Sequence, residues 1–128
     1  MKCTPLDPPR VFAVGAGSQI KLRDCGRLAL EVDEQITLTT PAGAEYDLTR
    51  KAWGFYATPS LNGRLRQFGL RAVLVRNPAG RYYVLLVEQG CEEEFFRYLQ
   101  GEQQTLVHWL DSDEALAALH RKLEDGQP

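Results

Sequence analysis

The chain has 128 residues, of which 44% are hydrophobic and 25% are charged, and its net charge is −2. This length and composition predict one compact, soluble globular domain over residues 1–128, with residues 1–10 and 125–128 frayed. They exclude a disordered chain, and we expect no membrane partner because no apolar run is long enough to cross a bilayer.

The N-terminal residues and the cysteines bear on the location of the protein. Residues 1–10 carry three prolines and no apolar stretch, which argues against a secretory signal. Cys3, Cys25 and Cys91 are odd in number and widely spaced, so they do not resemble a disulfide framework. We therefore expect a bacterial-type soluble domain in the cytoplasm.

Short strands are predicted along the first part of the chain. Apolar and polar residues alternate at 20–22, and the turn residues at 24–26 predict a reversal into a return strand at 28–32. The same alternation at 36–38 is followed by Pro and Gly at 40–43, which predict another turn. This pattern is typical of antiparallel strands joined in sequence.

The clearest hairpin is predicted in the middle of the chain. Residues 77–80 read Asn-Pro-Ala-Gly, a combination that favours a tight turn between strands at 70–76 and 81–88. Residues 84–87 are apolar on both faces, which predicts a central strand covered on both sides.

Helical periodicity follows the hairpin. Apolar residues at helical spacing, with three glutamates in the first turn, predict a helix over 91–100. A strand is predicted at 105–110, and then a second helix with Asp111 as its N-cap and Glu114 at N3. The expected fold is α+β: an antiparallel β-meander or partly closed small barrel of seven to eight strands, with two C-terminal helices. A sandwich is the alternative.

Charge is distributed unevenly along the chain. Residues 48–87 hold seven basic and no acidic side chains, whereas residues 88–128 hold ten acidic and three basic ones. One interpretation is that the acidic C-terminal region neutralises much of the basic middle. The other is that part of the basic surface stays open and binds an anion.

The candidate site is the long segment 50–69, which interrupts the strand pattern. Thr58, Pro59 and Gly69 predict a helix whose N-terminal N–H groups would face an anion. Aromatic rings just upstream could stack on a ligand, although such rings lie more often in a core. The predicted ligand-binding residues are Arg50, Lys51, Trp53, Tyr56, Thr58, Ser60, Asn62 and Arg64.

Known catalytic and metal-binding patterns are absent from the sequence. The two histidines, His108 and His120, lack metal-ligand spacing, and there is no Cys-x-x-Cys pair. There is also no Gly-x-Ser-x-Gly nucleophile elbow. We therefore expect no metal and no cofactor, and an enzyme is less expected than a binding protein.

The sequence thus predicts a small non-enzymatic module that binds an anionic or aromatic ligand, or a protein partner, through residues 50–71. A phosphorylated small molecule or a protein fits a local basic patch better than nucleic acid, which the acidic C-terminal region disfavours. Two alternatives stay open. One is a protein–protein accessory domain that forms a homodimer, and the other is a small enzyme with an unrecognised site.

Overall fold

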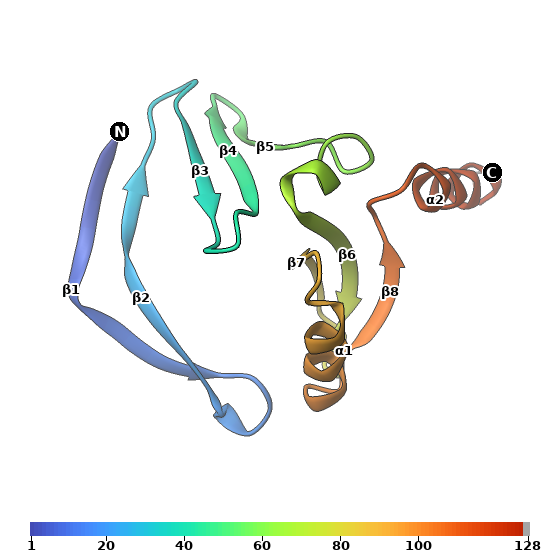
Figure 1. Ribbon diagram of the computed structural model, residues 1–128, viewed down its shortest axis with the longest axis horizontal. Coiled ribbons are helices and arrows are strands. Elements are labelled where there is room, and N and C mark those ends of the chain that lie inside the picture. The colour runs from blue at the N-terminus through green and yellow to red at the C-terminus, as the bar shows by residue number, and fades with distance from the viewer. Residues whose placement is uncertain (127–128) are drawn as a thin grey trace. The chain divides into compact units, whose positions relative to one another are not determined.

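The computed structural model describes residues 1–126 as eight strands and two α-helices (Figure 1). The predicted α+β class with two C-terminal helices is confirmed, but the strands form three antiparallel sheets that are not closed into a barrel. None of the helices in the described part of the chain has both the length and the apolarity to cross a membrane. The elements are β1 Lys2–Val14, β2 Ile20–Ala29, β3 Gln35–Thr39, β4 Glu45–Lys51, β5 Gly54–Thr58, β6 Leu70–Arg76, β7 Tyr82–Glu88, α1 Glu92–Gly101, β8 Thr105–Trp109 and α2 Asp113–Asp125, with single 3-10 turns η1 Ala16–Ser18 and η2 Arg66–Phe68.

Contacts divide the chain into two compact units. Unit 1 comprises Met1–Ile36 and Leu48–Tyr56, and unit 2 comprises Thr37–Asp47 and the described residues from Ala57 onward. The expectation of one domain over the whole chain stays a prediction. Most of the N-terminal segment that we expected to fray belongs to β1, and the predicted fraying at the C-terminus extends beyond the described residues.

Unit 1 is built around a long antiparallel ribbon of β1 and β2. The two strands pair from Val14 opposite Ile20 at the hairpin end to the N-terminal end of β1, with one shift of register on the way. The turn predicted at 24–26 is wrong, because these residues lie inside β2. Gly26 has φ 145°, and a Cβ there would lie 2.6 Å from the carbonyl oxygen of Thr4, so the strands approach too closely for any side chain.

Unit 1 has no apolar core. Every residue of this unit is described, and none is buried. Val11 and Leu28, which would be core residues in a packed sheet, are 59% and 47% exposed. Backbone and polar contacts hold the unit together: the Arg50 guanidinium donates to the Leu30 carbonyl oxygen at 2.8 Å, and the Asp33 N–H donates to the Arg50 carbonyl oxygen at 2.7 Å.

Unit 2 contains the predicted hairpin, which is confirmed as β6 and β7 paired from Leu70 opposite Glu88 to Arg76 opposite Tyr82. β8 pairs with the other side of β6, so the strand order is β7-β6-β8. Helix α1 covers one face of this sheet (Figure 1). The buried apolar residues between them are Val73, Val75, Val87, Phe95 and Leu99.

The second face of β6 carries a separate core cluster, made of Ala44, Leu65, Leu70 and Ala72. The prediction that 84–87 is a central strand covered on both sides is wrong. β7 is an edge strand, and Val84 is 59% exposed. The central strand is β6 instead. An apolar run alone does not distinguish the two positions, because the strand order depends on which distant strand adds to the hairpin.

Helix α2 begins one residue later than predicted. Its N-cap is Ser112, whose Oγ accepts a hydrogen bond from the Ala115 N–H at 3.1 Å. Asp111 is not the cap, because its carboxylate is buried and binds Arg71 at 2.8 Å. Both Asp111 and Ser112 are good capping residues by type, and the ion pair of the buried Asp111 with the half-buried Arg71 decides between them.

Candidate functional site

The helix predicted to start at Thr58 does not form. Thr58 ends β5, and the chain then passes through turns to the single turn η2. The Ser60 carbonyl oxygen accepts hydrogen bonds from the N–H groups of Gly63 and Leu65 at 3.3 and 3.2 Å. Asn62 and Gly63 are poor helix formers, which explains the failure. The helix N-terminus that was expected to face an anion is therefore not formed.

The eight residues predicted to form one site are divided between the two units. The ligand-binding role of these residues stays a prediction, but they do not all belong to one unit of the structure. Unit 1 holds Arg50, Lys51, Trp53 and Tyr56, and unit 2 holds Thr58, Ser60, Asn62 and Arg64.

Several polar members of this set already have partners inside the protein. Arg50 donates to a backbone carbonyl in unit 1, and Lys51 forms an ion pair with Asp33. In unit 2, the Asn62 side-chain amide donates to Asp113 at 2.8 Å, and the Arg64 guanidinium lies 5.1 Å from the centre of the Phe68 ring. Of the three cations in this set, Lys51 alone is shown paired with a carboxylate within the described residues.

The acidic C-terminal region neutralises further basic side chains in unit 2. Asp111 is only 3% exposed, and its Oδ2 lies 2.8 Å from Arg71 Nε and 3.7 Å from Arg66 Nε. The Arg71 guanidinium also stacks 3.8 Å from the centre of the Trp109 ring. Of the two interpretations of the charge pattern, this cluster supports internal neutralisation.

Three aromatic side chains at the hairpin of β4 and β5 are exposed, contrary to the more common core position. Trp53 lies in the turn and Phe55 and Tyr56 lie on β5, and they are 72%, 64% and 55% exposed. We call these three residues the aromatic hairpin. Phe55 and Tyr56 project to opposite faces, because successive side chains alternate along a strand. Phe55 is one of the aromatic rings that the sequence analysis expected to stack on a ligand, but it was left out of the predicted ligand-binding residues.

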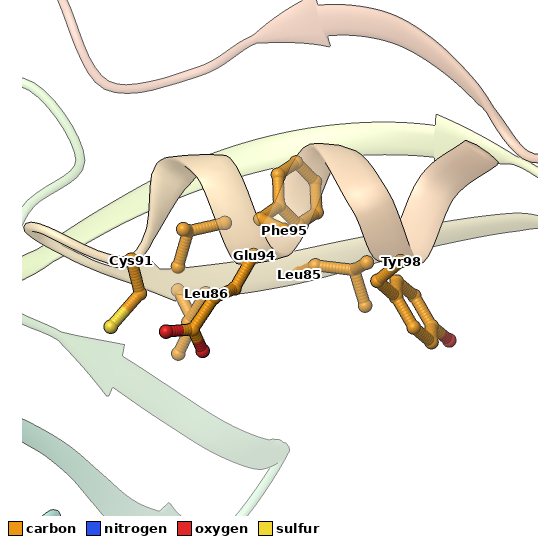
Figure 2. Close-up of a pocket in the computed structure, with 7 residues that line it drawn as sticks. Leu85, Leu86, Cys91, Glu94, Phe95 and Tyr98 are labelled. Carbon is orange, nitrogen blue, oxygen red and sulfur yellow. The ribbon is translucent and has the colours of Figure 1, made fainter. Parts of the chain in front are cut away.

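A groove lies between α1 and β7, entirely within unit 2 (Figure 2). Its volume is about 380 Å³, within the usual range for ligand pockets. Figure 2 shows Cys91, Glu94 and Tyr98 extending from the same side of α1, and Leu85 and Leu86 of β7 also line the groove. Residues three and four apart share one helix face, which accounts for this alignment.

The groove has a negative electrostatic character. The pKa of the Cys91 thiol is raised, first by burial and then by the neighbouring carboxylates of Glu94, Glu88 and Glu92. The sequence predicted both the helix and the strand that form the groove, but not this site. The reason is that periodicity in the sequence predicts helices and strands, but it does not show which side chains of a helix lie next to which side chains of a strand.

Comparison with known proteins gives one partial similarity. An alignment over 59 residues is 37% identical to expansin-B9 of Zea mays, and it covers 42% of this chain and 22% of that protein. Expansin-B1 of Zea mays is 36% identical over the same length, with the same coverage. The chain thus spans about a fifth of the length of the curated relatives that it matches. No family model matches the chain, and no solved structure matches it significantly.

The similarity corrects three expectations. The prediction of a bacterial-type domain in the cytoplasm is contradicted by the similarity to two expansins of a plant. The similarity to expansins also contradicts the predicted module for an anionic or aromatic ligand or a protein partner. The partners expected from the sequence, a phosphorylated small molecule, a protein or a second copy of the chain, stay predictions.

Proposed function

We propose that this chain is a carbohydrate-binding domain that attaches to cell-wall polysaccharide through the aromatic hairpin. The observation that carries the proposal is the exposure of Trp53, Phe55 and Tyr56, three large rings at one hairpin of a unit that has no core. The partial similarity to two expansins supports a polysaccharide as the ligand.

Aromatic rings and sugar rings attract each other for a simple physical reason. The face of an aromatic ring is negatively polarised, and the axial C–H groups of a pyranose present a weakly positive, apolar face. Stacking the two removes apolar area from water without removing sugar hydroxyls from solvent. Each aromatic side chain can bury roughly 150–250 Å² in this way. Exposed apolar groups gathered at one place on a surface are typical of an interaction site.

The backbone around the hairpin is well suited to hold these rings in place. The Arg50 N–H donates to the Glu34 carbonyl oxygen at 2.9 Å, and the Asp33 N–H donates back to the Arg50 carbonyl oxygen at 2.7 Å. Lys51, the residue after Arg50, forms an ion pair with the carboxylate of the same Asp33. A hairpin backbone that is ordered before binding loses less conformational entropy when the ligand arrives.

The experiment is a sedimentation assay with insoluble plant cell-wall polysaccharide. We expect Trp53→Ala to weaken binding about tenfold, which corresponds to about 1.4 kcal/mol, and the triple variant Trp53→Ala, Phe55→Ala, Tyr56→Ala to weaken it further. The matched control is Tyr82→Ala in unit 2. Tyr82 is also an exposed aromatic residue, 58% exposed, but it does not belong to the aromatic hairpin.

Two results would contradict the proposal. One is a wild-type protein that stays in the supernatant at every polysaccharide concentration. The other is a triple variant that sediments as well as the wild type.

A further inference from the structure

We infer that the groove between α1 and β7 is a second sugar-binding surface, and that it selects neutral sugar chains over acidic ones. The inference rests on the proposed function and deepens it, since it names the class of polysaccharide. It concerns unit 2 alone, whereas the aromatic hairpin belongs to unit 1.

The shape of the groove suits a short stretch of an extended chain. Its lining runs along α1 from Cys91 to Tyr98, about 10 Å at roughly 1.5 Å per residue. Leu85, whose side chain lies on the α1 face of β7, provides an apolar floor, and the Tyr98 ring, which is 41% exposed, stands at one end (Figure 2). A sugar ring can stack its C–H face on the tyrosine while its neighbour lies over Leu85.

Polar groups with open hydrogen-bonding capacity lie beside this apolar surface. Within the described residues, the Glu94 carboxylate and the Tyr98 hydroxyl have no hydrogen-bonding partner. A sugar hydroxyl can donate to the carboxylate, and the phenol can donate to a ring or hydroxyl oxygen. A few polar groups placed beside an apolar surface are typical of ligand sites, where they fix the orientation of the ligand.

The charge of the groove selects the class of sugar. Glu94 lines it, and Glu88 and Glu92 lie close enough to act on the thiol of Cys91 together with it. None of the described residues that line the groove is basic. A uronate carboxylate placed here would lose water and meet like charges, which is unfavourable on both counts. A neutral sugar meets neither penalty.

The test compares two soluble polymers with the same backbone, hydroxyethylcellulose as the neutral probe and carboxymethylcellulose as the acidic one. Native gels cast with each polymer measure how much the full chain is retarded relative to a gel without polymer. We expect the wild type to bind the neutral polymer at least threefold more tightly than the acidic one. Tyr98→Ala should weaken binding of the neutral polymer at least threefold.

The decisive variant is Glu94→Gln, which removes the charge and keeps a hydrogen-bonding side chain. It should retain binding of the neutral polymer and raise binding of the acidic one severalfold. Glu93→Gln is the control. This substitution changes the net charge of the same helix by the same amount, but Glu93 does not line the groove. Tyr98→Phe isolates the contribution of the hydroxyl.

The outcomes separate this inference from the proposed function. If Trp53→Ala weakens binding but Tyr98→Ala does not, or if Glu93→Gln changes the selectivity as much as Glu94→Gln, the groove is not a sugar site and the hairpin proposal stands. If Tyr98→Ala weakens binding and Trp53→Ala does not, the groove binds sugar and the proposal for the aromatic hairpin is wrong. If neither polymer retards the wild type, both fail.

Discussion

The two units of this protein are stabilised in different ways. In the described part of the chain, every buried apolar side chain belongs to unit 2, where α1 and the loop residue Leu65 pack against the two faces of β6. Unit 1 has backbone pairing and polar contacts but no buried residue. This difference bears on the exposed rings. Because unit 1 has no core, Trp53 does not stabilise the fold by burial, and its exposure has no structural explanation of that kind.

The largest difference is expected between the ion pairs of the two units. Asp111→Ala should lower the free energy of unfolding by about 3–5 kcal/mol, because it leaves the Arg71 guanidinium against a buried surface without its partner. Asp33→Ala, which removes the exposed partner of Lys51, should cost less than about 1 kcal/mol. Urea denaturation measures both, and equal losses would refute the distinction between the units.

The next difference concerns apolar side chains. Leu65 is fully buried, so Leu65→Ala should destabilise the protein by about 2–5 kcal/mol through lost burial and the cavity left behind. Val11→Ala in unit 1 should change stability by no more than about 0.5 kcal/mol, since Val11 is mostly exposed. Thermal unfolding followed by circular dichroism is a suitable measurement, and a large loss for Val11→Ala would reveal a core that unit 1 does not show here.

A smaller effect is expected at the start of α2. Ser112→Ala removes the hydrogen bond to the Ala115 N–H and should cost about 1 kcal/mol of stability. Ser112→Asp keeps an acceptor at the N-cap and should restore most of it. If Ser112→Ala unfolds at the same urea concentration as the wild type, the cap contributes nothing and α2 is held by its packing alone.

The smallest expected effect is on rate and not on stability. Because burial and nearby carboxylates raise the pKa of Cys91, less of its thiol is ionised at any given pH. Iodoacetamide should therefore modify Cys91 more slowly than the exposed Cys3 and Cys25 at pH 8, with the rates converging as the pH rises. Mass spectrometry of the modified peptides measures all three together. Glu94→Gln should speed the reaction of Cys91, and an unchanged rate would mean that Glu94 contributes little to the local potential.

Periodicity and turn chemistry predicted most of the elements of unit 2, because its strands and helices bury one face and the sequence records that face. The hairpin of β6 and β7, helix α1 and strand β8 were all predicted within a residue or two. The turn expected at 24–26 failed because a glycine inside a bulged strand and a glycine in a turn look alike in sequence. Local patterns did not identify the N-cap of α2 either, since the competing partner of Asp111 lies far away in the chain.

The candidate site was predicted less well for a related reason. Lys51 and Arg50 looked like open cations, but their partners come from other parts of unit 1 that only the fold brings near. The ligand-binding role predicted for Trp53 and Tyr56 stays a prediction, and their exposure could not be read from the sequence. The groove beside α1 depends on which side of the helix faces the edge of β7, and no short motif records that.

The two tryptophans have a practical consequence, because each belongs to a different unit. Trp53 stands in water at the hairpin of unit 1, while Trp109 is partly covered in unit 2 by the Arg71 guanidinium and the rings of Phe95 and Phe96. Their fluorescence should differ in colour, and replacing either one by phenylalanine leaves a single native reporter for the other unit. The protein thus carries its own pair of optical probes, with which the melting of each half can be followed without any added label.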